Sequence, residues 1–439
     1  MNRILRWCSG DLTKNELKKY VTLAFILFFI VGAYWVMRPL KDAIFAHIVG
    51  ITYQPLAKMV SLCLLVPLML GYAKLVDVLK KEKLFYGITI AYIVLFAVFD
   101  LLLTIPSIGM ANAEASPYRL LGWGCYAAIE SFGSVMVAMF WSFVTSTTKS
   151  ESAKRGFPLI IVIAQVGSIL GPTLDTFATI LGIPLLMGIA VWAMILVLVL
   201  MVVYVKANPP NEAHIFEKSS KTGMFEGLRL ILAEPYVLGI LAVATLFDVV
   251  YTIMDYQMKV LGQAMYKTPE AFAEFLGHFG QSVNTLALVF ALTGTGFLIR
   301  RVGLQFCLLF FPAAVAFVVA YVYANPGLWQ VFTGLVIIRG LAYGLNNPTK
   351  EIMYIPTSID IQFKAKSWID VFGSRGAKAA GSVINHWLAD SASALLLYGT
   401  VASFVVVAIW MVAAAYVGRT FTQLMTEDGV IGQKNPGIG

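Results

Sequence analysis

The chain is short of charged residues. Only 13% of its 439 residues are Asp, Glu, Lys or Arg, whereas a soluble domain carries about 25%. Hydrophobic residues make up 59%, and they fall in about 12 runs of the roughly 20 apolar residues that a membrane-spanning helix needs. These runs occupy nearly the whole chain. The composition therefore excludes a separate soluble domain and predicts an all-α membrane protein with about 12 transmembrane helices.

Cysteine and histidine are also scarce, and the common enzyme motifs are missing. The four cysteines have no paired spacing, which gives no sign of a disulfide framework or a zinc site. The four histidines are scattered and form no His-Glu-x-x-His motif. There is also no Gly-x-x-x-x-Gly-Lys-Ser/Thr loop for ATP hydrolysis. We therefore expect no enzyme, no cofactor and no metal site.

The formal net charge of +8 follows the membrane topology. Basic residues precede the first predicted span and follow the second, fourth, sixth, eighth, tenth and last, whereas the intervening connections carry far fewer. This alternation places both termini in the cytoplasm of a bacterial inner membrane and argues against a nucleic-acid surface. The predicted spans are 20–46, 53–78, 84–106, 118–146, 156–179, 183–205, 228–262, 283–299, 303–324, 327–346, 366–388 and 393–417.

A hydrophilic connection near the middle of the chain divides the spans into two sets of six. We expect an N-terminal half at 1–205, a cytoplasmic central loop at 206–227 and a C-terminal half at 228–439. In the second half, the segment Thr268 to Gly280 is amphipathic and too short to span, so we expect a separate external interfacial helix there.

A weak repeat supports the two halves. Gly71 to Lys83 and Gly296 to Gly303 occupy equivalent connections, and each combines glycine with cytoplasmic cations. This pattern is similar to the loop that major-facilitator transporters repeat in each half. The resemblance implies a major-facilitator-like fold that binds substrate near the membrane midplane, between the halves, and rocks them to alternate access.

Charged residues lie inside the predicted spans of the first half. Arg38, Lys41 and Asp42 share one face of the first helix, being spaced i, i+3 and i+4. Glu130 lies inside the fourth. Charges in a membrane are costly unless they face a bundle interior, a partner or water. Glu130 is therefore expected to meet a cation, bind a proton or face water, and the alternative is a fixed ion pair between helices.

The second half has charges of both signs in its spans. Asp248 and Asp255 are seven residues apart on the seventh helix and share a face. Both are candidates for proton coupling or for balancing lysines at the substrate site, although Asp255 and Lys259 can also form a simple i, i+4 pair. Arg375 and Lys378 lie at i, i+3 in the eleventh helix, either as binding residues or as partners of nearby acids.

These charges predict a site for a polyanion. If the halves face each other, Arg38 and Lys41 oppose Arg375 and Lys378 across a concave pocket. Arginine offers a bidentate fork to phosphate oxygens, and lysine offers a mobile point charge. Phosphorylated metabolites are therefore the leading candidates for the substrate.

Several motifs resemble those of the nucleotide transporter family of plastids and intracellular bacteria, whose best-known members exchange ATP for ADP. The resemblance covers most of the chain. Its motifs are Arg38-Pro-Leu-Lys41-Asp42, Glu130-Ser-Phe-Gly-Ser134, Met139-Phe-Trp-Ser-Phe143, Ser152-Ala-Lys154, Met254-Asp-Tyr-Gln-Met-Lys259 and Lys350-Glu-Ile-Met-Tyr-Ile-Pro356 followed by Lys364, Lys366, Asp370 and Lys378.

The resemblance implies functional roles for Lys41, Glu130, Asp255 and Lys378. The chain departs from the family pattern at Asp255, where the family has glutamate, and at residues 373–378, where Arg375 adds a cation. The resulting prediction is a transporter in contact with membrane lipid that exchanges ATP or another nucleotide for ADP or a related nucleotide. A proton-coupled importer of nucleotides or other anionic metabolites is the alternative, and a lipid flippase or membrane enzyme is a third interpretation.

Overall fold

Long helices make up nearly all of the protein. The structure is a computed structural model that describes residues 12–148, 150–208, 224–293, 301, 303–389, 391–427 and 429–432. Among these residues, 10 helices are long and apolar enough to cross a membrane. The two other predicted spans correspond to α11 (Pro269–Thr293) and to a helical segment at 361–388.

The chain divides into two compact units. One contains residues 1–217 together with 263–284, and the other contains residues 218–262 together with 285–439. The end of α10 (Pro235–Met265) and the first part of α11 thus belong to the same unit as the N-terminal helices, although they lie late in the sequence.

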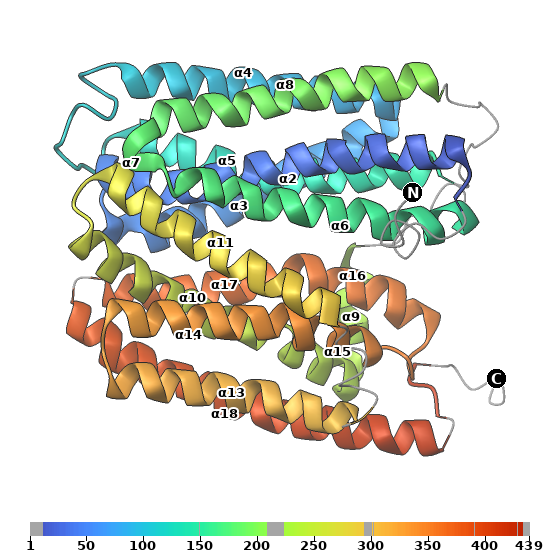
Figure 1. Cartoon of the computed structure of the whole chain (residues 1–439). Helices are drawn as coiled ribbons and strands as arrows, with labels where there is room; N and C mark the ends of the chain where they lie inside the picture. The colour runs from blue at the N-terminus through green and yellow to red at the C-terminus, as the bar shows by residue number, and fades with distance from the viewer. Residues whose placement is uncertain are drawn as a thin grey trace. The chain divides into compact units, whose positions relative to one another are not determined.

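The N-terminal unit is built around α2 (Lys14–Ile48), which packs against α5, α6 and α8. A capping box begins α2: the Thr13 hydroxyl accepts a hydrogen bond from the Glu16 backbone, and the Glu16 carboxylate accepts one from Thr13. The other helices of this unit, seen in blue to green in Figure 1, are α3 (Gln54–Val78), α4 (Lys81–Thr104), α5 (Leu120–Ser146), α6 (Ser150–Asp175), α7 (Ala178–Leu181) and α8 (Ile183–Ala207).

The C-terminal unit contains most of α10 and the helices that follow α11. Helices α13 and α18 run side by side in Figure 1 and pack against each other along their length. Its elements are α9 (Met224–Ala233), α10, α13 (Leu304–Ala324), α14 (Leu328–Leu341), α15 (Asn347–Ile352), α16 (Lys366–Trp368), α17 (Ser374–Leu388) and α18 (Ala392–Thr426), with π-helical turns at Ala342–Asn346, Ile361–Ala365 and Ile369–Gly373.

Glycines let α2 and α6 approach closely, which fixes the helix that carries Arg38 and Lys41. A Cβ atom on Gly167 would lie 2.5 Å from the backbone oxygen of Phe28, and one on Gly171 would lie 2.7 Å from that of Gly32. Gly167 and Gly171 are four residues apart, the small-xxx-small spacing that allows membrane helices to pack backbone to backbone.

Three helix boundaries differ from the sequence prediction. No separate interfacial helix exists at 268–280, because this segment is the start of the continuous helix α11, whose Phe272, Phe275 and Leu276 are buried. The predicted seventh helix begins instead as α9, which ends before Pro235, and α10 then starts at Pro235. A proline inside a helix removes a backbone hydrogen bond and its ring clashes with the preceding turn, so the two helices are separate. The eleventh is interrupted by π-helical turns.

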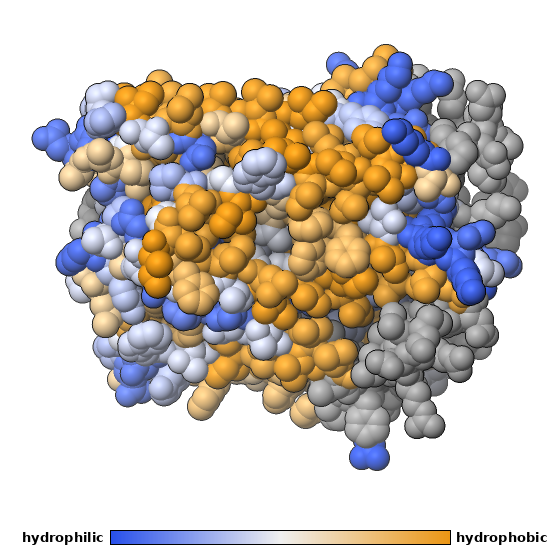
Figure 2. Space-filling view, turned by 45° about the horizontal axis from the view of Figure 1, so that its top comes forward, coloured by the Kyte–Doolittle hydropathy of each residue, from blue (hydrophilic) through white to orange (hydrophobic). Residues whose placement is uncertain are grey.

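Apolar side chains cover the outward faces of the long helices. Val94 and Leu101 of α4 and Trp192 of α8 are among the exposed hydrophobic residues. The face in Figure 2 is largely apolar along the helices, with hydrophilic residues gathered near their ends. Such a surface suits contact with lipid tails, since these helices satisfy their backbone hydrogen bonds internally.

We expect Gly167→Ala to destabilise the N-terminal unit by about 1–3 kcal/mol, because the added methyl group overpacks the α2–α6 contact. Thermal unfolding in detergent measures the loss. Gly87→Ala in α4 is the matched control, since a Cβ atom there has no neighbour within 4 Å. Equal stability of the two variants would contradict the close-packing argument.

Candidate functional site: a charged cavity and a buried ion pair

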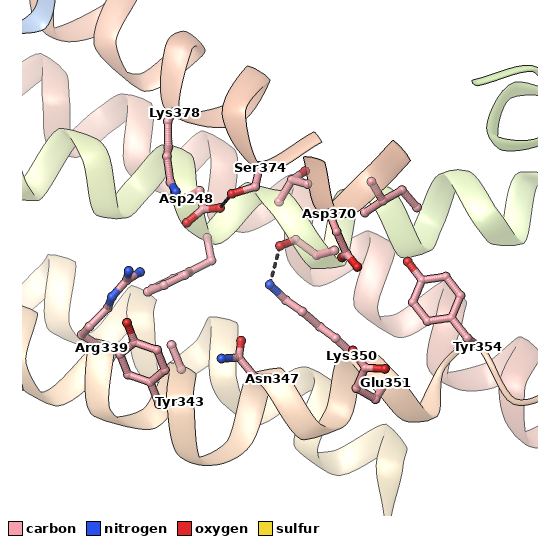
Figure 3. Close-up of a pocket in the computed structure, with 15 residues that line it drawn as sticks. Asp248, Arg339, Tyr343, Asn347, Lys350, Glu351, Tyr354, Asp370, Ser374 and Lys378 are labelled. Carbon is pink, nitrogen blue, oxygen red and sulfur yellow. Dashed lines mark hydrogen bonds between the residues drawn. The ribbon is translucent and has the colours of Figure 1, made fainter. Parts of the chain in front are cut away.

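The C-terminal unit contains a cavity of about 420 Å³ between its helices. Charged and aromatic side chains point into it from helices that are far apart in the sequence (Figure 3). The lining residues are Ala244, Thr245, Phe247, Asp248, Arg339, Ala342, Tyr343, Asn347, Lys350, Glu351, Tyr354, Ile369, Asp370, Ser374 and Lys378.

One helical stripe supplies most of the polar groups. Arg339, Tyr343, Asn347, Lys350 and Tyr354 follow one another at intervals of three or four residues. Residues at these intervals lie on one face of a helix, so the segment from α14 through α15 presents a continuous row to the cavity.

A second stripe faces it from the start of α17. Asp370, Ser374 and Lys378 are four residues apart and all line the cavity. Arg375 is one position beyond Ser374, about 100° further round the helix, and it is not among the lining residues. The structure therefore brings Lys378 to the cavity but not Arg375.

Both stripes begin or run through π-helical turns. Ala342 and Tyr343 belong to one such turn, and Ile369 and Asp370 belong to another. Turns of this kind occur mostly as short interruptions of α-helices, frequently at functional sites. Here they coincide with the two segments that carry the cavity's charges.

The charges are distributed unevenly along the cavity. At one end, Lys378, Arg339 and Lys350 line the cavity together with the carboxylate of Asp248 (Figure 3). At the other end, Glu351 and Asp370 lie with Tyr354 (Figure 3), and Glu351 forms an ion pair with Lys366, which is outside the lining. The cavity therefore has a cationic end and a more acidic end.

Hydrogen bonds hold two of the cationic end's groups in place. The Ser374 hydroxyl donates to the Asp248 carboxylate at 2.5 Å. The ammonium group of Lys350 donates to the carbonyl oxygen of Ala244, also at 2.5 Å. Each contact joins α10 to one of the two stripes: Ser374 belongs to the second stripe and Lys350 to the first. Together they fix the spacing of the three segments that line the cavity.

Aromatic rings surround the guanidinium of Arg339. Its central carbon lies 4.4 Å from the centre of the Tyr251 ring and 5.2 Å from that of Tyr343. Phe247 is at 6.0 Å. Cation–π contacts stabilise a desolvated arginine, while the planar fork still suits a phosphate group.

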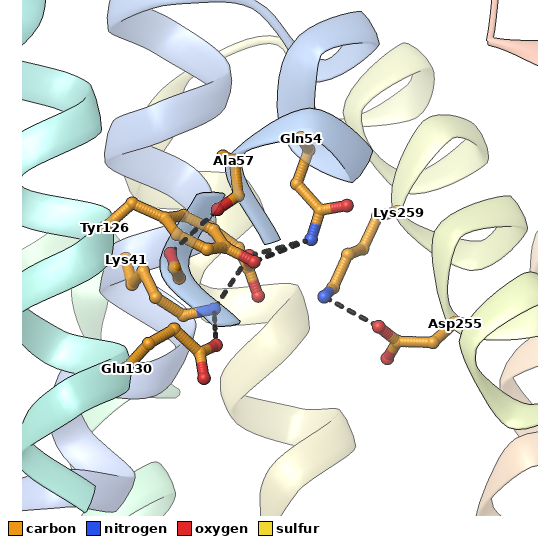
Figure 4. A network of polar contacts seen from close by, with 9 residues as sticks. Lys41, Gln54, Ala57, Tyr126, Glu130, Asp255 and Lys259 are labelled. Atoms are coloured by element: carbon orange, nitrogen blue, oxygen red, sulfur yellow. Dashed lines mark hydrogen bonds and ion pairs between the residues drawn. The ribbon is translucent and has the colours of Figure 1, made fainter. Parts of the chain in front are cut away.

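The N-terminal unit contains a separate buried network around Lys41 (Figure 4). The Lys41 ammonium lies 2.7 Å from a Glu130 oxygen and 3.3 Å from an Asp42 oxygen. It also lies 3.9 Å from the centre of the Tyr126 ring. The side chain of Lys41 is only 3% exposed and that of Glu130 is 31% exposed. Glu130 is therefore the member of the pair that solvent or a ligand can reach.

A glutamine connects the remaining members of this network. The amide of Gln54 donates to Asp42 at 3.3 Å and to the Tyr126 hydroxyl at 3.2 Å. Asp42 thus pairs with Lys41 and accepts from Gln54, which orients the lysine toward Glu130. Arg38, one turn earlier on α2, lies over the Trp35 ring at 4.7 Å.

Asp255 takes part in a local ion pair. Its carboxylate lies 2.7 Å from the ammonium of Lys259, one turn later on α10 (Figure 4). Both side chains are buried. Asp248 lines the cavity and Asp255 does not, so the structure separates two acids that the sequence places on one helix face.

Two lysines of the sequence motif act outside the cavity. Lys364 forms ion pairs with Glu226 at 2.8 Å and Asp360 at 2.9 Å. Lys366 pairs with Glu351. These contacts tie α9 and α15 to the segment that leads into α17.

Solved structures with the same fold define the class of protein. A bacterial homologue of the iron transporter ferroportin is 13% identical with a TM-score of 0.66, covering 92% of this chain and 100% of that one. A structure of the peptide transporter POT with alafosfalin is 17% identical with a TM-score of 0.61, covering 92% and 95%. The predicted all-α, major-facilitator-like fold is therefore confirmed.

The chain belongs to the TLC ATP/ADP transporter family, whose sequence profile matches residues 8–116 and 123–421. ADP,ATP carrier protein 1 of Chlamydia muridarum is 25% identical, over 93% of this chain and 89% of that protein. The chloroplastic ADP,ATP carrier protein 2 of Arabidopsis thaliana is 26% identical, over 94% and 76%. ADP,ATP carrier protein 1 of Rickettsia prowazekii is 25% identical, over 87% of both. The predicted family of nucleotide-exchanging transporters is therefore confirmed.

Two cationic lining residues were not among the predicted binding residues. Arg339 and Lys350 have the helical spacing that connects them through Tyr343 and Asn347, and this periodicity was the signal that could have found them. Asp175, at the end of α6, was also missed, although it is a charge inside the predicted span 156–179. It is fully buried, and neither of its carboxylate oxygens has a hydrogen-bond partner among the described residues.

We expect Lys41→Met to destabilise the protein by about 3–5 kcal/mol, because it removes the cation that pairs with the carboxylates of Asp42 and Glu130. The double variant Lys41→Met with Glu130→Gln should recover part of that loss. Thermal unfolding of both single variants and the double variant measures the coupling. Strictly additive losses would show that the two charges do not interact.

Proposed function

We propose that the protein exchanges ATP or another nucleotide for ADP or a related nucleotide by alternating access. The observation that carries this proposal is the cavity where Arg339, Lys350 and Lys378 converge from two helical stripes. Membership of the TLC ATP/ADP transporter family and the names of the related carriers support it.

The cationic end of the cavity is the proposed phosphate site. Arg339 offers the donors for a bidentate contact, while Lys350 and Lys378 supply charge that can follow a flexible phosphate chain. Tyr343 lines the same cavity with 36% of its surface exposed. It offers a ring on which a nucleotide base can stack, with an energy of about 0.5–1.5 kcal/mol beyond area burial for aromatic pairs.

The ion pair in the N-terminal unit is the proposed second phosphate contact. Lys41 is buried between two carboxylates, and Glu130 is its accessible partner. A phosphate oxygen that replaces Glu130 would keep the lysine neutralised and free the carboxylate. Arg38, on the same helix, is a further candidate, whereas Asp255 and Arg375 remain proposed contributors without a place in the described cavity.

The acids explain why exchange is favoured over one-way transport. A site containing several cations and no anion is unstable in a membrane, so a return step without a bound anion needs internal carboxylates as substitutes. Asp248 and Glu130 have the required partners. The return step is easier when a second nucleotide occupies the cations, which couples import of one nucleotide to export of another.

The orientation in the membrane follows from the basic connections. The excess of lysine and arginine on alternate connections supports cytoplasmic termini in a bacterial cytoplasmic membrane. Nucleotides from the cytoplasm then reach the side of the protein that is richer in cations.

We expect nucleotide uptake into proteoliposomes to require nucleotide inside the vesicles and to be insensitive to an imposed proton gradient. Uptake of labelled ATP into vesicles preloaded with ADP, compared with empty vesicles, measures this requirement. Uptake into empty vesicles driven by a proton gradient would instead establish the proton-coupled importer. The buried, unpartnered carboxylate of Asp175 favours that alternative, because a buried carboxyl group avoids the cost of charge by binding a proton.

We expect Lys378→Gln to weaken nucleotide binding by about tenfold or more, since a hydrogen bond to a charged group contributes about 1.5–3 kcal/mol. Titration of the purified protein with ATP and ADP, followed by thermal shift, measures the affinity. Lys267→Gln is the control because Lys267 is exposed and lies outside the cavity. Full binding by the Lys378 variant would exclude this cavity as the phosphate site.

A further inference from the structure

Asp248 stands out in the cavity because it is an acid in the proposed phosphate site. It is 8% exposed and accepts a hydrogen bond from Ser374. Three cations line the same end of the cavity, namely Lys378, Arg339 and Lys350 (Figure 3). A carboxylate so close to a bound phosphate would repel it, so its position needs a reason beyond substrate attraction.

The neighbouring acids do not share this position. Glu351 pairs with Lys366 at the other end of the cavity. Asp370 is exposed and lies at that same end with Glu351 and Tyr354 (Figure 3). Three cations and the single carboxylate of Asp248 therefore leave the cationic end with a formal charge of +2, whereas the three cations alone would give +3.

We propose that Asp248 sets the number of negative charges that the cavity accepts on a phosphate chain. This inference rests on the proposed nucleotide transport and concerns its selectivity. A fixed carboxylate repels every additional charge on the substrate, so it penalises a triphosphate more than a diphosphate and a diphosphate more than a monophosphate. The hydrogen bond from Ser374 keeps the carboxylate inside the cationic cluster, where this penalty is largest.

The position gives Asp248 one role in the empty cavity and another in the occupied cavity. Without substrate, the Asp248 carboxylate partly neutralises the three cations of the cavity, which lowers the cost of the empty cavity. With substrate, the same charge limits how strongly a highly charged chain is held. A carrier that bound a triphosphate too tightly would release it slowly, because dissociation rates fall as affinity rises.

The test compares the affinities for AMP, ADP and ATP in wild type and in Asp248→Asn, without divalent cations. Each phosphoryl group in this series adds negative charge to the same base and ribose. The asparagine keeps an oxygen that can accept from Ser374 but removes the charge. We expect the ratio of ATP to AMP affinity to rise by about tenfold or more, because the substituted charge acts at short range in a partly buried site.

Three further variants make the test specific. Asp248→Glu keeps the charge and should keep the ratio, whatever it does to the absolute affinities. Lys378→Gln removes a cation and should lower the ratio, which gives a second measurement if Asp248→Asn does not fold. Asp370→Asn makes the same charge change at the other end of the cavity and should shift the ratio less than Asp248→Asn does.

The outcomes separate this inference from the proposed function. If wild type binds nucleotides and the ratio does not change in Asp248→Asn, the inference is wrong and the transport proposal stands. An equal rise in Asp248→Asn and Asp370→Asn would also overturn it, because net charge and not position would then decide selectivity. If wild type binds none of the three nucleotides, the proposed function itself fails.

Discussion

Charge neutralisation inside the membrane is the constraint on which this structure depends. A transporter of anions needs cations within its spans, yet an isolated cation there costs several kcal/mol or more. In this protein the charges are paired. Lys41 lies between Glu130 and Asp42, and Asp248 lines a cavity together with Arg339, Lys350 and Lys378. Each pairing lowers the free-energy cost of placing a cation within the helices that span the membrane.

The helices are arranged so that these pairs keep their geometry. Close packing of α6 on α2 through Gly167 and Gly171 fixes the helix that carries Lys41. Hydrogen bonds from Lys350 to Ala244 and from Ser374 to Asp248 fix the three segments of the cavity. Closely packed interiors move as rigid elements and not by continuous deformation. This property suits a transporter that alternates between discrete states.

The two charged sites differ in kind. The Lys41 site is compact, and its cation is fully paired and only 3% exposed. The cavity of the C-terminal unit has a volume of about 420 Å³ and a gradient from a cationic to a more acidic end. In the transport function proposed above, the first site would exchange one anion for another, and the second would recognise a substrate with a charged chain and a neutral base.

The sequence by itself determined the helical class, most of the spans and the family. Apolar runs of membrane length have few other structures available, because a chain in lipid must satisfy its backbone hydrogen bonds internally. It also singled out Lys41, Glu130, Asp248 and Lys378, since charges inside apolar runs are conspicuous.

Only the tertiary structure decided which charges meet. Asp248 and Asp255 share a helix face, yet only Asp248 lines the cavity, and Lys378 reaches it while Arg375 does not. Lys350 and Arg339 join the site because π-helical turns and packing between distant segments set the direction of each stripe. The spacing of residues along a chain fixes the face they share, but the neighbour of that face depends on how the helices pack, which local sequence does not encode.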